Sequence, residues 1–160
     1  MILFKASGKT YRRVVTRALH AFPFSPAEVL AHELVLLSKN RQDCRNGEGQ
    51  IQYLAKLLSV EPATAAELEQ YFPGVNAGER WKYVARLYWS RPLEHAFSLF
   101  HVDGLNHRRY DTVQEFARVD AGDELLLLDF LCRSNPKTVL DFLSNAEPPY
   151  GSGQDGEVGQ

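Results

Sequence analysis

The sequence predicts an all-α fold, a single-domain helical bundle of about seven or eight helices. Apolar residues recur at helical spacing in several segments, and residues typical of helix N-termini stand just before many of them. The chain of 160 residues also has the length of one domain, which is expected over residues 1–147. Residues 148–160 are expected to form a disordered acidic tail rich in proline and glycine.

The first expected helix covers residues 8–22, where an apolar stripe lies opposite a basic face. Further helices are expected over residues 26–38, 48–59, 64–72, 77–89, 121–133 and 136–145. Thr64 and Glu67 form a capping box, and Asn135 followed by Pro136 marks another helix start. The residues expected to point inward include Val15, Leu19, Leu30, Leu34, Leu54, Leu68, Trp81, Val84, Leu128 and Leu143.

Residues 93–119 fit two structures. Their apolar spacing favours helices over residues 93–101 and 111–119. The dipeptide Asp103-Gly104, between two runs that contain aromatic residues, is instead typical of a β-hairpin turn. We expect helices here and keep the hairpin as the alternative.

The overall composition is that of a globular protein with no general attraction to nucleic acid or to anionic membranes. Apolar residues make up 44%, charged residues make up 24%, and the net charge is −2. No uninterrupted apolar run exceeds four residues, which excludes a membrane-spanning helix. The only cysteines, Cys44 and Cys132, fit a reducing compartment. We therefore expect a cytoplasmic protein, and we assume a bacterial or mobile-element origin.

The charges are unevenly distributed along the chain. Residues 1–58 carry nine basic and four acidic residues, residues 59–110 carry six of each, and residues 111–160 carry three basic and ten acidic residues. Such asymmetry indicates two surfaces for different partners, or one surface that neutralises the other. Ordinary solvated faces would give the same pattern.

The favoured function is that of a non-enzymatic recognition module associated with DNA or RNA. Three successive expected helices, 48–59, 64–72 and 77–89, fit a helix-turn-helix-like unit. A hairpin at Asp103-Gly104 would add a wing, giving a winged-helix-like unit over residues 48–113. The third helix, 77–89, would be the one that reads the bases. Phosphate and base contacts are expected from the basic face of the first helix, from helix 77–89 and from the wing. The residues are Lys9, Arg12, Arg13, Arg17, Lys82, Tyr83, Arg86, Arg108 and Arg109.

The alternative function is that of a protein-binding adaptor or inhibitor. In that case the acidic C-terminal half would dock on a basic partner, and the basic helix would serve solubility or self-association. The carboxylates expected at that surface are Asp120, Asp123, Glu124 and Asp129.

A remote alternative is ribonuclease action. The spacing of Arg13 and His20 resembles the short arginine–histidine signature of helical HEPN-type ribonucleases. The resemblance implies paired motifs across a dimer, which would activate the 2′-hydroxyl and stabilise the phosphate.

Other catalytic and metal-binding patterns are incomplete. Ser7-Gly8-Lys9-Thr10 lacks the earlier glycine of a phosphate-binding loop, because position 3 is Leu3. His32-Glu33 lacks the second histidine of a zinc-protease helix, because position 36 is Leu36. We therefore expect no catalytic residue, no cofactor and no metal.

Overall fold

The computed structural model describes residues 1–23, 33–40, 49–111 and 115–145. The strands in these ranges are β1 (Ile2–Ala6), β2 (Leu19–Phe22), β3 (Leu34–Lys39), β4 (Gln50–Pro62), β5 (Tyr83–Phe97) and β6 (Phe116–Arg118). The helices are α1 (Gly8–Arg17), α2 (Ala65–Tyr71), α3 (Ala77–Arg80), α4 (Arg108–Asp111), α5 (Ala121–Ser134) and α6 (Pro136–Asn145), with a 3-10 turn, η2 (Leu99–His101).

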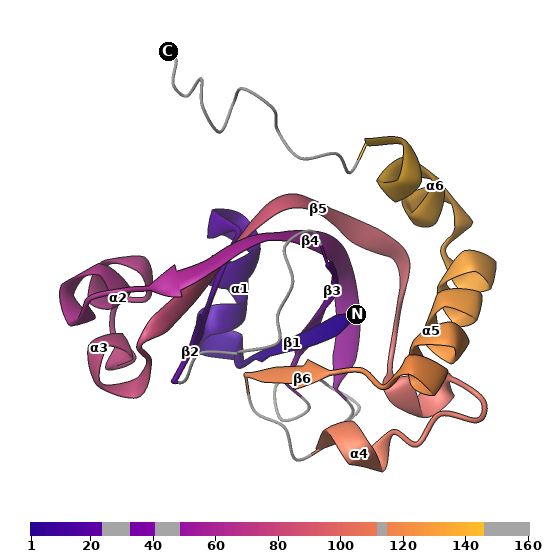
Figure 1. The fold of residues 1–160 in the computed structure, drawn as a ribbon, viewed down its shortest axis with the longest axis horizontal. Helices are drawn as coiled ribbons and strands as arrows, with labels where there is room; N and C mark the ends of the chain where they lie inside the picture. The colour runs from indigo at the N-terminus through magenta and orange to yellow at the C-terminus, as the bar shows by residue number, and fades with distance from the viewer. Residues whose placement is uncertain (24–32, 41–48, 112–114, 146–160) are drawn as a thin grey trace.

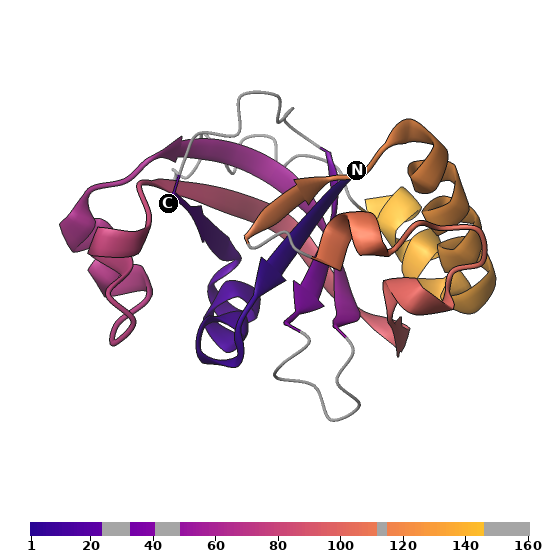
Figure 2. The same cartoon turned by 90° about the horizontal axis from the view of Figure 1, so that it is seen from below.

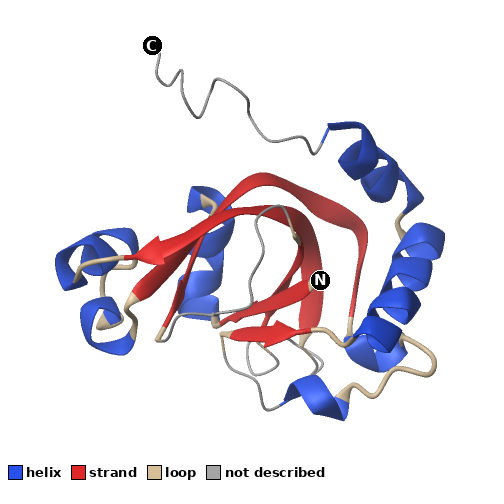
Figure 3. Ribbon diagram, in the orientation of Figure 1, coloured by secondary structure: helices blue, strands red, loops and turns tan. Residues whose placement is uncertain are grey.

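The described strands form one six-stranded sheet with the order β2-β5-β4-β3-β1-β6 (Figures 1 and 3). β1 and β3 are parallel, and the other neighbouring strands are antiparallel. The fold is therefore mixed α/β, and the prediction of an all-α bundle is wrong.

The helix-turn-helix-like unit is also absent from the described residues. The segment 48–59 belongs mainly to β4, and the expected reading helix 77–89 is one turn, α3, followed by the start of β5. Asp103-Gly104 lies in the loop between η2 and α4, where Gly104 has φ +82°, so this turn forms no hairpin wing. The expected helices 64–72, 121–133 and 136–145 are confirmed as α2, α5 and α6.

β-bulges in β4 explain why a strand looked like a helix in the sequence. β4 has an extra residue at two places: Gln52 in its pairing with β3 and Leu58 in its pairing with β5. Each bulge adds a residue to one strand and interrupts the two-residue alternation of side chains. The apolar residues of β4 consequently follow a spacing close to that of a helix.

The sheet curls until its two edge strands, β2 and β6, approach each other (Figures 1 and 2). His20 in β2 donates its Nε2–H to the backbone carbonyl of Glu115, just before β6, at 2.8 Å. Beside this bond the rings of Phe22 and Phe116 lie edge to face, with centroids 5.8 Å apart. These contacts close the curled sheet along one seam.

Two apolar clusters lie on opposite faces of the sheet. The first contains Phe4 and Phe22, fills the inside of the curl and includes residues of α1, α2 and α3. The second lies on the outer face, where Leu36 and Leu54 meet Leu127 of α5. In Figure 2 the α2–α3 pair and the α5–α6 pair lie at opposite ends of the sheet. None of the described helices is long and apolar enough to cross a membrane.

The predicted inner residues are mostly right. Leu19, Leu54, Leu68, Trp81 and Val84 are buried, as predicted. Val15, Leu34 and Leu128 are half-buried. Leu30 lies outside the described residues. Leu143 is wrong: its side chain is 71% exposed, because α6 turns Val139 and Phe142 toward the sheet instead.

Candidate nucleic-acid interface

Helix α1 connects β1 to β2 and presents a basic face to solvent. Tyr11 and Val14 are buried against the sheet, whereas Arg12 and Arg17 are exposed and Arg13 is half-buried. Ala18 ends the helix in the left-handed conformation, φ 55°, and its carbonyl accepts the Leu87 N–H at 2.9 Å. The turn at Ala18 therefore fixes the C-terminal end of α1 against β5.

Five other arginines are neutralised by carboxylates, whereas Arg80 and Arg108 form no ion pair with a described residue. The ion pairs are Arg86–Glu61 (2.7 Å), Arg91–Asp141 (3.3 Å), Arg118–Glu33 (2.8 Å), Arg133–Asp129 (2.7 Å) and Arg109–Asp120. By contrast, Arg12, Arg13 and Arg17 form no ion pair with any described residue. Their positive charge is therefore available to an external anion.

The remaining residues predicted to contact nucleic acid are dispersed. The side chain of Lys9 lies outside the described part of the structure, and Lys82 and Arg108 are exposed. Tyr83 is half-buried at the start of β5. Arg86 is fixed by its ion pair and by a 3.4 Å hydrogen bond to the Tyr71 hydroxyl, and the hydrogen bond to Glu61 raises the pKa of its guanidinium. Tyr83 and Arg86 therefore do not form one base-contacting surface with Lys82.

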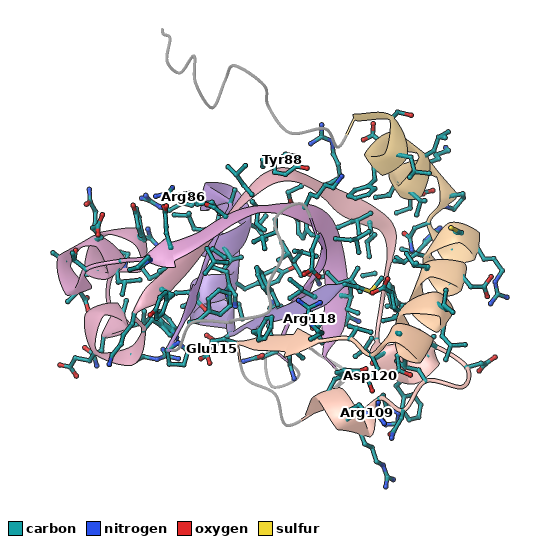
Figure 4. The ribbon with its side chains drawn as sticks, viewed as in Figure 1. Arg86, Tyr88, Arg109, Glu115, Arg118 and Asp120 are labelled. Carbon is teal, nitrogen blue, oxygen red and sulfur yellow. The ribbon has the colours of Figure 1, made fainter. Side chains whose placement is uncertain are left out.

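Arg109 joins the predicted basic surface to the predicted acidic one. It pairs with Asp120 and approaches Asp123 at 3.9 Å, whereas Arg86 lies far from it (Figure 4). Asp123 also accepts the Tyr110 hydroxyl at 2.5 Å; burial and this bond raise the pKa of Tyr110. Here one predicted surface neutralises the other.

The two other predicted docking carboxylates also have partners within the chain. Glu124 accepts a hydrogen bond from the Met1 nitrogen at 2.8 Å, and Asp129 pairs with Arg133 one helical turn away. A partner protein would have to compete with these contacts. Docking through the acidic half stays a prediction.

His20 is buried in the seam and does not act together with Arg13. Its ring is 4% exposed and packs 4.8 Å from Phe4. Burial lowers the pKa of His20 to about 4, so the ring is neutral at pH 7. Arg13 belongs to α1 and His20 to β2, so the helical arginine–histidine motif implied by the HEPN resemblance does not form.

Within the described ranges, no group of three His, Cys, Asp or Glu residues could hold a metal ion. Cys132 is exposed and free, and Cys44 lies outside these ranges. Absence of enzymatic activity stays a prediction.

The curled, mixed sheet is similar to solved structures of ASCH proteins. The ASCH protein from Zymomonas mobilis has a TM-score of 0.56 and 11% identity, over 80% of this chain and 93% of its own. A point mutant of that protein gives the same TM-score and identity. A hypothetical protein from Leishmania major has a TM-score of 0.53 and 13% identity, over 81% of this chain and 92% of its own. The sequence matches no protein-family model and no curated protein.

The sequence contained the signal for the basic surface of α1. It did not show which of the predicted basic residues are neutralised within the protein. Arg13 and Arg17 stand one turn apart, and no acidic residue occurs before Glu28. The pairing of Arg86 with Glu61, 25 positions earlier, required the register of β4 and β5. Only the fold therefore separates the available arginines from the neutralised ones.

Proposed function

We propose that the protein binds nucleic acid, and that α1 contacts the phosphate backbone. The observation that supports this proposal is the lack of an ion pair at Arg12, Arg13 and Arg17 among described residues, in a protein whose other arginines are largely paired. An arginine without an internal carboxylate retains its full attraction for a phosphate. Three such arginines on one short helix match a polymer with repeated phosphates better than they match a single small anion.

The charge distribution and the fold are both consistent with this function. The net charge of −2 gives no general attraction to nucleic acid, so binding must depend on a local basic surface. The ASCH-like fold is loosely consistent with nucleic-acid association. Arginine–phosphate contacts carry no sequence information by themselves, so we expect little sequence preference from α1.

Fluorescence anisotropy of labelled single-stranded RNA, single-stranded DNA and duplex tests the proposal. The Arg12→Ala/Arg17→Ala variant removes two exposed charges and leaves the half-buried Arg13 in place. On single strands the slope of log K against log salt should become shallower by about 0.7 for each phosphate that the variant no longer neutralises. Because binding to duplex releases more counterions, the change there should be about 0.9 per phosphate.

The matched control is Arg91→Ala. Arg91 is also an exposed arginine, at 50%, but Asp141 already neutralises it, and it lies outside the basic face of α1. Its removal should leave both the affinity and the salt slope unchanged. Absence of binding at micromolar protein in low salt, or equal effects of the α1 variant and the control, would contradict the proposal.

A further inference from the structure

A cavity lies between η2 and α5. Figure 1 shows α5 on the opposite side of the fold from α1. Its volume is about 270 Å³, just below the range of about 300–1,000 Å³ usual for small-molecule sites. This size suits one ring system and excludes a dinucleotide or an extended cofactor. The cavity is lined by segments 101–103 and 126–134.

The floor of the cavity is apolar and held in place from below. Val102, Leu126 and Phe130 contribute to it. The Phe130 ring packs on Phe97 of β5 with a centroid distance of 4.7 Å, so the sheet supports the floor. A flat aromatic ligand would cover apolar surface here without requiring the helix to move.

The rim of the cavity carries acceptors and donors side by side, from His101, Asp103, Asp129, Arg133 and Ser134. Arg133 donates to Oδ2 of Asp129 at 2.7 Å, which orients both side chains along α5. Oδ1 of Asp129 has no hydrogen-bond partner among the described residues, and the remaining N–H groups of Arg133 extend the same edge. A ligand that matches this edge needs an N–H group beside an acceptor atom.

An exposed aromatic ring stands next to the cavity. Phe100 is 60% exposed, and its ring lies edge to face with His107 at 5.0 Å and with His101 at 6.1 Å. His101 itself lines the cavity. Exposed aromatic rings beside a pocket are typical of surfaces that stack nucleobases.

We propose that the η2–α5 cavity binds a single nucleobase through an edge that carries an N–H next to an acceptor, as the N3–H and O4 of uracil do. Asp129 accepts the N–H, Arg133 donates to the acceptor, and Phe130 contacts the ring. Adenine also offers such an edge through its N6–H and N7, whereas 3-methyluracil lacks the N–H and fits this edge less well. The ligand class rests on the proposed function, since a protein that holds a phosphate backbone is exposed to its bases.

Nuclear magnetic resonance titration of the full chain with neutral nucleosides tests this site apart from α1, because nucleosides carry no phosphate. Uridine and guanosine should shift the amide signals of Val102, Leu126 and Phe130. 3-Methyluridine, which lacks the N3–H, should bind about three- to tenfold more weakly than uridine, the ratio expected when one hydrogen bond is missing. Shifts confined to other parts of the protein, or no shifts at millimolar nucleoside, would overturn the proposal.

Two variants with a matched control complete the experiment. Asp129→Asn replaces the carboxylate by an amide and should weaken uridine binding about three- to tenfold. Asp141→Asn makes the same change at an exposed carboxylate of α6 that pairs with Arg91, and it should have no effect. Leu126→Trp fills the cavity and should abolish the shifts while the circular dichroism stays that of the parent protein. Equal uridine affinity in all three variants would overturn the assignment.

The two proposals fail in different ways. Nucleoside binding at the cavity without binding of labelled strands would contradict the role of α1 and leave the cavity site standing. Salt-dependent strand binding without any nucleoside shift would contradict the cavity site and leave the role of α1 standing.

Discussion

The side chain of Asn135 pairs with the backbone of His95. Its Oδ1 accepts the His95 N–H at 2.7 Å, and its Nδ2 donates to the His95 carbonyl at 3.3 Å. Asn135 is fully buried at the junction of α5 and α6, and it therefore takes the place of a neighbouring strand beside β5. Nearby, the Glu94 carboxylate accepts the N–H groups of Lys137 and Thr138 at the start of α6.

We expect Asn135→Ala to lower the free energy of unfolding by about 1–3 kcal/mol, because it removes both hydrogen bonds between a fully buried side chain and the His95 backbone. Urea denaturation followed by circular dichroism measures the loss. The control is Asn106→Ala, at an exposed asparagine, which should stay within about 0.5 kcal/mol of the parent protein. Equal losses in the two variants would show that Asn135 does not hold the helices to the sheet.

The seam histidine predicts a pH dependence of stability. Because the pKa of His20 is about 4 in the folded protein and 6.5 in the unfolded chain, the unfolded chain binds the extra proton between these values. The contribution is fully present above pH 6.5 and is lost as the pH falls toward 4. The total loss is about 3 kcal/mol.

Urea denaturation between pH 7.5 and pH 4 tests this dependence. The His20→Gln variant should lose about 3 kcal/mol less over this range than the parent protein, because glutamine does not titrate. His95→Gln, at an exposed ring, should follow the parent protein. Identical pH profiles for all three proteins would refute the assignment to His20.

Replacing two glycines by alanine should change the stability of the protein in opposite directions. At Gly78 a Cβ would lie 2.9 Å from both the Cβ and the backbone oxygen of Ala65, so α2 and α3 would have to separate. We expect Gly78→Ala to destabilise the protein by about 1–3 kcal/mol. At Gly122, in the first turn of α5, a Cβ meets nothing within 4 Å, and alanine should stabilise by up to about 1 kcal/mol. Thermal melts of the two variants give the signs directly.

Two leucines of the C-terminal helices provide a test of the packing. Leu127 lies on the inner side of α5 and is fully buried, whereas Leu143 of α6 is 71% exposed. We expect Leu127→Ala to cost about 2–5 kcal/mol and Leu143→Ala less than about 0.5 kcal/mol. Comparable costs, measured by urea denaturation, would mean that α6 packs through a different face.

Sequence reasoning identified elements whose signals are local. Helix α2 begins at Thr64, whose hydroxyl accepts the Glu67 N–H while the Glu67 carboxylate accepts the Thr64 N–H, as the capping box predicted. The basic face of α1 was visible for the same reason, because its arginines follow one another on a single helix. Such signals depend on residues a few positions apart, and the sequence displays them directly.

The strands escaped prediction because both faces of the sheet are covered. Leu36 belongs to the outer cluster and its neighbour Leu37 to the inner one, so β3 has no polar side and no alternation. The pairing of Arg109 with Asp120 escaped for another reason: it depends on how α4 packs against α5. Long-range contacts of this kind decide which predicted charges remain available.

The position of β1 dictates when the fold can be completed during synthesis. β1 is made before the other described strands, yet it lies inside the sheet between β3 and β6, and Ile2 pairs with Arg118. Until β6 has emerged, one side of β1 has no partner and the seam at His20 stays open. Such distant pairing gives a high contact order, which slows folding and leaves a hydrophobic strand edge open to other chains. The nascent chain therefore exposes one edge of β1 to aggregation until residues 116–118 have been made.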